Sequence, residues 1–374
     1  MATISYLTRI EFGEGEAAKL PDYCAGLGMQ RPLLVTDAGL TALGLTARIA
    51  ALFEDSVAGA PPVYDGTPAN PTEAASLEAL AVYRSENCDG VLAVGGGSSI
   101  DLGKALRLLA AHQPPLAQYA AVEGGVARIK GPLPPMVAVP TTAGTGSEVG
   151  RGAVIIMADG RKLGVLSPLL LPSIAVCDPE LTYGLPPLLT AATGMDALAH
   201  CLETYMAPAV NPPADAIALE GLVRGAGALR RAVADGSDRQ ARWDMMMAAM
   251  EGAMAFQKGL GAVHALSHPL GALPGVTLHH GTLNAVLLPA VLRFNRPAIG
   301  AKWDRLAEIL GGAPDQEIAR LNADVGMPSG LGAMGVAEDR LPAIAAAALK
   351  DHCHATNPRR ASEADYLALL QEAF

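Results

Sequence analysis

Several absences in this sequence each exclude a class of protein. Basic charge is scarce: 27 Lys and Arg stand against 37 Asp and Glu, for a net charge of −10, which argues against a nucleic acid or an anionic membrane as partner. No uninterrupted apolar run reaches the roughly eighteen residues of a membrane span, and residues 1–20 lack the basic-then-apolar pattern of a signal peptide. We therefore expect a cytoplasmic protein that binds neither nucleic acid nor membrane.

Cysteine is also sparse. The five cysteines are scattered, odd in number and form no C-x-x-C pair, which favours reduced thiols over a disulfide framework or a thiolate zinc site. Apolar material is abundant instead: 51% of the residues are hydrophobic and 17% charged, so the chain belongs with globular proteins. A length of 374 residues favours two domains.

Strand and helix patterns alternate in the first half of the chain. Short apolar runs followed by turn residues predict strands, and Ala- and Leu-rich stretches such as 40–53 and 71–86 predict helices. This alternation indicates a parallel sheet covered on both faces. After the proline-rich segment 181–189 the strand patterns cease, so we predict an α/β domain over 1–182 and an all-helical domain over 183–374. The predicted strands fall at 31–37, 61–66, 88–97, 134–142, 152–157 and 173–179.

Two loops at predicted strand ends are suited to a phosphate group. Residues 91–111 read as a strand, a glycine turn and a helix, an arrangement that aims backbone N–H groups at an anion. The pattern is GGGS and not G-x-G-x-x-G, because Ile100 stands at the third glycine position. The second loop, 141–149, is rich in hydroxyl groups and glycine. The alternatives are a tight turn that needs glycine in the first loop and a helix-start capping box of Thr145 and Glu148 in the second.

Asp37 ends the first predicted strand. An acidic side chain at such a place accepts hydrogen bonds from a ribose and repels a 2′-phosphate. The residue is equally compatible with a simple turn aspartate, so by itself it leaves both interpretations open.

Histidine is concentrated in a mostly apolar segment, since residues 259–281 hold four of the eight. If that segment is helical, His264 and His268 project from one face a turn apart, and the same spacing relates Asp196 to His200. Two such pairs can converge on a divalent ion such as Fe(II), Zn(II), Mn(II) or Co(II), and the absence of thiolate argues against a closed structural zinc site. For any one histidine, a hydrogen-bonded or surface side chain is the alternative.

Pro269 directly follows His268. Proline disfavours continued helix, so we expect His268 at a helix end beside a cavity. That position favours a task other than metal ligation for this histidine.

Taken together, these residues resemble the iron-containing, type III alcohol dehydrogenases, which are nicotinamide-dependent enzymes unrelated to the zinc medium-chain kind. The resemblance implies an N-terminal Rossmann-like α/β domain and an all-α C-terminal domain, the fold shared with dehydroquinate synthase, with cofactor and metal in the cleft between them. It runs over nearly the whole chain. The motifs that carry it are VTD (35–37), GGGSSID (95–101), PTTAGTGSEV (140–149), CDPEL from Cys177, ATGMDALAHCLE (192–203), GLGAVHALSHPLGA (259–272), HHGTLNAVLLP (279–289) and NPR (357–359).

The resemblance also implies roles for individual residues. His268 falls beside the nicotinamide and the substrate, where it would relay a proton, and Asp37 falls where the family reads the adenosine ribose, which implies NAD over NADP. The metal ligands fall on Asp196, His200, His264 and His280. The pyrophosphate and further cofactor contacts fall on Gly95, Gly96, Gly97, Ser98, Asp101, Thr141, Thr142, Thr145 and Lys162.

Two departures from the family's pattern bear on the site. The spacing from His268 to His280 is two residues longer than usual and His279 stands beside His280, so either neighbour is a candidate for the fourth ligand, with His280 favoured. After Phe256, a Gln-Lys pair replaces a small polar triplet and brings a cation close to the cleft. Lys258 and Phe256 are therefore candidate substrate contacts, and the lysine suggests a carboxylate-bearing aldehyde. The alternative is a solvated lysine at a helix end.

The resemblance thus implies an oxidoreductase that interconverts a small primary alcohol and its aldehyde by hydride transfer, with NAD(H) and Fe(II), or Zn(II) in its place. Two rivals on the same fold stay open: a zinc polyol dehydrogenase of the glycerol type and a lyase of the dehydroquinate synthase type. By family habit we expect a homodimer or a larger homo-oligomer.

Overall fold

The computed structural model describes residues 8–54, 56 and 59–374. These residues form two compact units, an α/β unit of residues 8–142 and 147–182 and a helical unit of residues 143–146 and 183–374. The short segment 143–146 belongs to the helical unit because its glycines let the backbone approach closely. A Cβ at Gly144 would lie 2.7 Å from Thr193, and one at Gly146 would lie 2.1 Å from Ala253. No helix among the described residues is long and apolar enough to cross a membrane.

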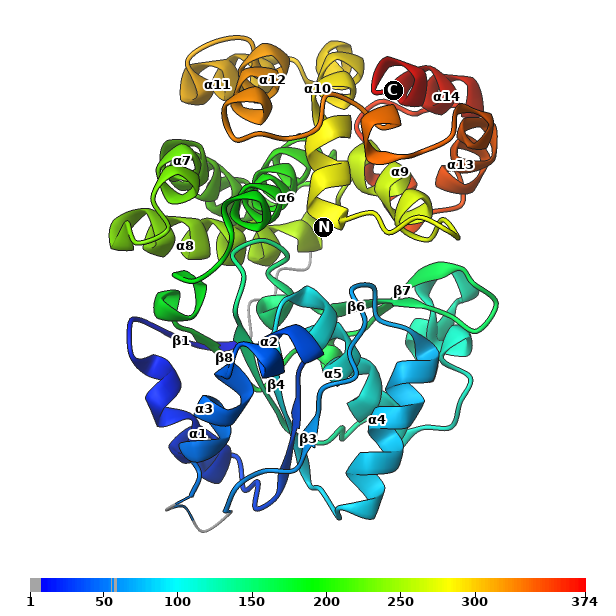
Figure 1. Ribbon diagram of the computed structural model, residues 1–374. Helices are drawn as coiled ribbons and strands as arrows, with labels where there is room; N and C mark the ends of the chain where they lie inside the picture. The colour runs from blue at the N-terminus through cyan, green and yellow to red at the C-terminus, as the bar shows by residue number, and fades with distance from the viewer. Residues whose placement is uncertain (1–7, 55, 57–58) are drawn as a thin grey trace. The chain divides into compact units, whose positions relative to one another are not determined.

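The α/β unit contains a six-stranded parallel sheet with strand order β1-β8-β5-β4-β2-β3 (Figure 1). Its strands are β1 Arg9–Phe12, β2 Pro32–Val35, β3 Val63–Tyr64, β4 Gly90–Gly95, β5 Met136–Pro140 and β8 Ile174–Cys177. Its α-helices are α1 Leu20–Gly26, α2 Ala38–Ala42, α3 Leu45–Ala51, α4 Glu73–Ser85 and α5 Gly97–Ala111. The predicted parallel sheet with helices between its strands is confirmed.

Both faces of this sheet are buried, as its nearly continuous apolar strands require. On β2, Leu33 and Val35 pack in one core with Leu106 of α5, whereas Leu34 packs on the opposite face with Leu20 of α1. Figure 1 shows α4 and α5 on one side of the sheet and α1 and α3 on the other. Since each fully buried Leu or Val is worth about 1.5–3 kcal/mol, both cores hold the register of the strands and the place where β4 ends.

Three details of this unit differ from the sequence-based expectation. The run 152–157 forms β6 Gly152–Ile156, which pairs antiparallel with β7 Lys162–Leu166 in a separate hairpin and not with the parallel sheet. Strands β1 and β7 were not predicted, because both are short and only partly buried. The single helix expected over 40–53 is divided into α2 and α3 by Gly44, whose φ of 76° is left-handed.

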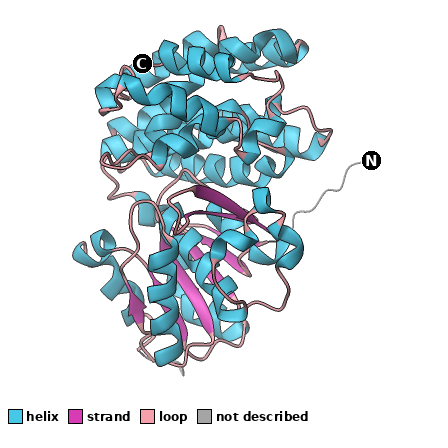
Figure 2. Cartoon of the chain, turned by 90° about the vertical axis from the view of Figure 1, so that its right-hand side faces the viewer, coloured by secondary structure: helices cyan, strands magenta, loops and turns pink. Residues whose placement is uncertain are grey.

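The helical unit contains no strand in residues 183–374, all of which the structure describes (Figure 2). The central helix α6 packs against α7, α8 and α10, while α9 packs against α10 and α13. Small residues in α6 allow this close packing: a Cβ at Gly194 would lie 2.4 Å from Leu229 of α7. The α-helices are α6 Pro187–Met206, α7 Pro212–Ala234, α8 Arg239–Ala255, α9 Ala262–Gly271, α10 His280–Ile299, α11 Ala301–Leu310, α12 Pro314–Asp324, α13 Leu341–Ala348 and α14 Glu363–Glu372.

Candidate active site

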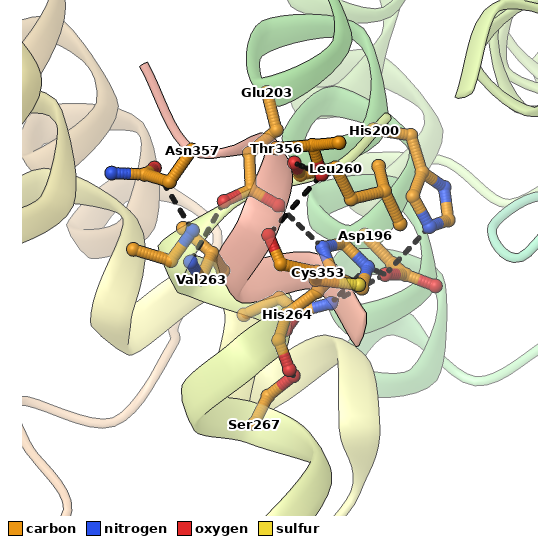
Figure 3. Close-up of polar contacts among 12 residues, drawn as sticks. Asp196, His200, Glu203, Leu260, Val263, His264, Ser267, Cys353, Thr356 and Asn357 are labelled. Atoms are coloured by element: carbon orange, nitrogen blue, oxygen red, sulfur yellow. Dashed lines mark hydrogen bonds and ion pairs between the residues drawn. The ribbon is translucent and has the colours of Figure 1, made fainter. Parts of the chain in front are cut away.

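A buried cluster of one carboxylate and three imidazoles lies where α6, α9 and α10 meet. Ligand atoms of Asp196, His264 and His280 all lie within 4.8 Å of one another. Asp196 Oδ1 is 3.7 Å from Nε2 of His264 and 3.8 Å from Nε2 of His280. His200 completes the cluster at one edge: its Nε2 is 3.7 Å from Asp196 Oδ1, and its ring stacks on His264 with centroids 4.8 Å apart. Figure 3 shows Asp196, His200 and His264 pointing toward one another.

Helix geometry explains the convergence. Asp196 and His200 are four residues apart on α6 and therefore share one face, which is turned into the bundle. His264 lies on α9, and His280 is the first residue of α10. His279 instead precedes α10, is exposed, and has its Nδ1 3.4 Å from Thr282 Oγ1. The structure thus brings His280, and not His279, to the cluster.

The side-chain amide of Asn284 lies among the polar atoms of the cluster and shows whether they suit a cation. Its Nδ2 donates to Asp196 Oδ1 at 2.6 Å and lies 3.2 Å from Nε2 of both His264 and His280. Its Oδ1 is buried and has no hydrogen-bond partner among the described residues. Several lone pairs therefore converge without a lysine or arginine beside them in the described part of the chain, and an amide turned about its axis would add one more oxygen. One carboxylate with three imidazoles suits a divalent ion of borderline softness such as Fe(II) or Zn(II), so the residues present fit a metal site.

The charges of the cluster are coupled. Burial by itself would raise the pKa of Asp196, but His200, His280 and His264 hold that pKa below its ordinary value. Burial lowers the pKa of His200 to about 4, which leaves its ring neutral at pH 7 with a lone pair to offer. Although burial opposes it, the carboxylates of Asp196 and Glu203 raise the pKa of His264 to about 9. A metal ion that binds His264 must therefore displace a proton.

Glu203 is a residue of the site that the sequence analysis missed. Its Oε2 lies 2.6 Å from His264 Nδ1, and its Oε1 accepts a hydrogen bond from the Val263 amide at 2.7 Å (Figure 3). A carboxylate on Nδ1 fixes the ring so that Nε2 faces Asp196, as outer carboxylates do around many metal ligands. The signal was present, because Asp196, His200 and Glu203 recur four and three residues apart on one face of α6.

Asn357, from the NPR motif, anchors the start of α9. Its Oδ1 accepts hydrogen bonds from the Ala262 amide at 3.0 Å and from Asn295 Nδ2 at 3.0 Å. Its Nδ2 donates back to Asn295 Oδ1 at 2.8 Å, so the pair is buried and mutually satisfied. This anchor sets the position of α9 and, through it, of His264.

His268 lies in the last turn of α9, at the helix end that the sequence predicted. The helix continues through Pro269 to Gly271. Pro269 is tolerated because it stands in the last turn, where its missing N–H costs at most one hydrogen bond. His268 Nδ1 lies 2.8 Å from Asp351 Oδ2, and its ring stacks on His280 with centroids 5.7 Å apart. Asp351 was not found from the sequence, since it lies 83 residues away along the chain.

In the α/β unit, the glycine loop leads from β4 into α5. Gly95 has a φ of 152°, and a Cβ there would lie 2.5 Å from Ser99 Oγ, so only glycine fits. Gly96, the N-cap of α5, has no side chain to cap this fifteen-residue helix. The Ser99 amide donates to Gly96 O at 3.1 Å, so the amides of Gly97 and Ser98 are the ones that can face an anion. Ser98 Oγ donates to Ala69 O at 2.6 Å, and a Cβ on Gly96 would lie 3.5 Å from Thr142 Oγ1.

The other predicted nucleotide contacts already have protein partners. Asp37 caps α2 by accepting from the Leu40 amide at 3.0 Å. Asp101 accepts from the Ser147 hydroxyl at 2.5 Å and from the Val154 amide at 2.9 Å, so both of its oxygens hold the segment after β5. The remaining predicted contacts are Lys162, whose Nζ donates to Asn70 Oδ1 at 2.8 Å, Thr141, which is buried directly after β5, and Thr145, which belongs to the helical unit.

Lys258 and Phe256 lie in a short 3-10 helix, Phe256–Lys258, that follows α8. The Phe256 ring meets the His200 ring edge to face, with centroids 5.3 Å apart. The Lys258 side chain is buried, forms an ion pair with Asp215, and donates to Tyr205 O at 3.1 Å. It is neither solvated nor unpaired, so the structure gives its ammonium a protein carboxylate as partner.

Comparison with known proteins places this geometry in context. The model of the family described as "Iron-containing alcohol dehydrogenase" matches residues 8–179, and that of the "Fe-containing alcohol dehydrogenase family, C-terminal" matches residues 190–374. The chain is 56% identical to a 4-hydroxybutyrate dehydrogenase from Cupriavidus necator over all of both chains. The crystal structure of a 1,3-propanediol oxidoreductase superposes with a TM-score of 0.93 at 38% identity over all of both chains. A sulfoacetaldehyde reductase from Bifidobacterium kashiwanohense in complex with NAD+ has a TM-score of 0.87 at 26% identity, covering 100% of this chain and 98% of that one.

Proposed function

This chain belongs to the iron-containing alcohol dehydrogenase family, and on that premise we propose that it interconverts a small primary alcohol and its aldehyde with NAD(H) and a bound divalent metal ion. The observation that carries the proposal is the convergence of Asp196, His264 and His280 on one point, with the buried Asn284 amide beside them.

The residues that would hold the ion are Asp196, His200, His264 and His280. When bound, the ion supplies Lewis-acid chemistry that polarises a carbonyl or lowers the pKa of an alcohol. We propose Fe(II) because of the family, and Zn(II) is the alternative because imidazole and carboxylate bind it at least as tightly. Glu203 would hold the His264 ring in place for the ion.

His268 is the proposed proton relay. Asp351 Oδ2 accepts a hydrogen bond from the Nδ1–H group, so Nε2 keeps its lone pair and could take the proton of the alcohol hydroxyl. The nicotinamide, when bound, would supply the hydride acceptor. Replacement by alanine, His268→Ala, should lower kcat by about 10²–10⁴-fold and leave the metal content unchanged. Turnover kinetics and elemental analysis of the same preparation measure both. A loss of metal would assign His268 to the ligands instead.

For the nucleotide we propose that the pyrophosphate binds at the open N-terminus of α5, on residues 95–98. Asp37 at the end of β2 supports NAD over NADP, since a carboxylate repels a 2′-phosphate. A relative in complex with NAD+ also supports this choice. Asp37→Ala should then narrow the difference between the KM values for NADH and NADPH.

We propose that the substrate is an ω-hydroxy acid or its semialdehyde. The names of two relatives, a 4-hydroxybutyrate dehydrogenase and a sulfoacetaldehyde reductase, both specify molecules with an anionic group. A neutral diol is the alternative, and similarity to a 1,3-propanediol oxidoreductase supports it. We also propose a cytoplasmic homodimer or larger homo-oligomer, which size-exclusion chromatography with light scattering would test.

The test of the function is NADH oxidation by the Fe(II)-loaded protein with 4-oxobutanoate and butanal, beside a chelator-treated sample and an NADPH series. Chelator-sensitive oxidation of NADH is the expected result. Tight NADH binding without turnover of either aldehyde would favour the lyase alternative. Activity confined to a Zn(II)-loaded sample with polyols would favour the glycerol-type alternative.

A further inference from the structure

The proposed function leaves open which protein group binds the carboxylate of a hydroxy acid. Lys258, the cation that the sequence suggested for this task, is buried and paired with Asp215. Its ammonium also donates to Tyr205 O. Because this buried pair would have to be broken before the ammonium could meet a substrate, the carboxylate needs another partner.

Three imidazole rings in the helical unit form a row that leads away from the cluster. The ring of His268 stacks on His280 with centroids 5.7 Å apart at an interplanar angle of 10°. It also stacks on His352 with centroids 5.5 Å apart at 18°. His352 begins a 3-10 helix, His352–Thr356, so a ring distant in sequence is brought next to the proposed relay.

The two ends of this imidazole row are more accessible than its middle. The side chains of His280 and His352 are 23% and 24% exposed, whereas that of His268 is 6% exposed. A small molecule can therefore approach both the cluster and His352. A four-carbon hydroxy acid spans roughly 6 Å from hydroxyl to carboxylate when extended, which matches the 5.5 Å between the rings of His268 and His352.

The ring nitrogens of His352 have only weak protein partners. Nδ1 is 3.6 Å from Asp351 Oδ1, and Nε2 is 3.5 Å from the Cys353 sulfur, a poor hydrogen-bonding atom. Asp351, the anion beside it, is already engaged, because its two oxygens accept from His268 Nδ1 and from the Cys353 amide, each at 2.8 Å. His352 thus keeps an N–H group for an incoming anion.

We propose that His352 binds the substrate carboxylate and selects aldehydes and primary alcohols that end in a carboxylate about four carbons away. The inference rests on the proposed function, since it assigns a specificity residue to that reaction. A neutral imidazole suffices as hydrogen-bond donor, and a bound carboxylate favours the imidazolium form, which strengthens the contact. The selected substrate would then lie with its hydroxyl beside His268, the proposed proton relay, and its carboxylate at His352.

The test compares 4-oxobutanoate with butanal, its neutral counterpart of equal chain length, in the metal-loaded enzyme. His352→Leu should raise the KM for 4-oxobutanoate at least about tenfold and leave the KM for butanal unchanged. His352→Gln keeps an N–H donor, so its KM for 4-oxobutanoate should lie between the values of the wild type and of His352→Leu. The matched control is His354→Leu: His354 lies in the same short helix, but its Nδ1 is 2.9 Å from the Tyr366 hydroxyl. Equal effects on both aldehydes, or the same selectivity change in His354→Leu, would overturn the proposal.

Equilibrium binding separates this inference from the proposed function. Calorimetry with 4-hydroxybutyrate should give an affinity about tenfold weaker in His352→Leu than in the wild type, with thermal unfolding confirming that both are folded. If the wild type reduces butanal as readily as 4-oxobutanoate, the carboxylate site is wrong while the dehydrogenase stands. If it reduces neither, the proposed function fails, and the calorimetric comparison alone decides whether His352 binds the carboxylate: equal affinities would refute it.

Discussion

Two buried clusters of this protein each contain an aspartate and differ in the group that carries the positive charge beside it. In the helical unit, Asp196 and its imidazoles surround a point that no lysine or arginine occupies among the described residues. In the α/β unit, the buried Lys104 ammonium fills the corresponding place, 3.8 Å from Asp101. Both clusters are enclosed, so burial alone does not tell a functional site from a structural one.

Lys104 is a cation that its surroundings satisfy completely. Its three N–H groups can donate to the carbonyl oxygens of Ser147, Gly150 and Gly152 at 2.6, 2.9 and 2.7 Å, and Nζ also lies 2.8 Å from the Ser147 hydroxyl oxygen. Burial lowers the pKa of Lys104 to about 8, yet these oxygens and Asp101 compensate the charge. The cluster ties the segment after β5 to α5, and we assign it a structural role.

The cluster around Asp196 holds its positive charge as a proton on His264, which a metal ion can displace, whereas the charge of Lys104 belongs to a fixed ammonium. The Asn284 Oδ1 atom has no partner in the described part of the chain. The Lys104 cluster and the Asp196 cluster therefore differ in whether a lysine side chain or an exchangeable ion supplies the positive charge. A cluster that includes its own cation stabilises the fold, whereas one with converging lone pairs is suited to an ion from solution. Substitutions in each cluster should therefore have opposite signatures.

The largest effect is expected from Asp196→Ala. Loss of the carboxylate ligand should remove the metal and lower kcat/KM at least about 10⁴-fold, because a Lewis acid is worth several kcal/mol in the transition state. The metal-free fold should keep its stability, since a buried charge is removed with it. Elemental analysis, kinetics and thermal unfolding measure these outcomes. If Asp196→Ala kept its metal and lost thermal stability instead, the Asp196 cluster would have a structural role like the Lys104 cluster.

Lys104→Met should act in the opposite way. The substitution leaves three carbonyl oxygens without a donor and Asp101 without its cation, and it should lower the free energy of unfolding by about 3–5 kcal/mol, as for a broken buried pair. The folded fraction should still bind one metal ion. Urea unfolding measures the stability, and Lys19→Met, which loses only a surface ion pair with Glu16, is the control without measurable change.

Glu203→Gln would sharpen the comparison, since this residue supports a ligand without being one. The substitution removes the negative charge of the carboxylate that contacts His264 Nδ1. It should weaken the affinity for the metal ion about 10–100-fold while the protein still folds. Competition with a chromophoric chelator measures the affinity. Glu251→Gln, on neighbouring α8, is the control, and equal affinities in the two variants would remove Glu203 from the metal site.

The smallest effect concerns Glu148, next to the Lys104 cluster. Burial raises the pKa of Glu148 from 4.5 to about 7, so the folded chain holds this proton more tightly than the unfolded chain. The stability it contributes is complete below about pH 4.5 and is lost as the pH rises through about 7. Glu148→Gln should therefore gain about 1–2 kcal/mol relative to the wild type between pH 5 and pH 8, as judged by urea unfolding. A constant difference across that range would contradict the assignment.

Much of the site could be inferred from spacing along one element. Asp196 and His200, or the glycines before α5, lie within one turn or one loop, where helix and turn geometry dictate direction. Partners from distant segments could not be inferred in this way. His268 meets Asp351 across 83 residues, and Lys258 meets Asp215 across 43.

The sequence by itself determined the alternation of strands and helices in the first half, the helical second half and the family, because periodicity and motifs are local properties. It also placed His264 and His268 on one helix. Three features became known only from the tertiary structure: β6 pairs with β7 outside the parallel sheet, Lys258 forms an ion pair with Asp215, and the His352 ring stacks on the His268 ring. Each depends on which segments meet, and that is set by how whole faces of helices and sheets are buried rather than by neighbours in the chain.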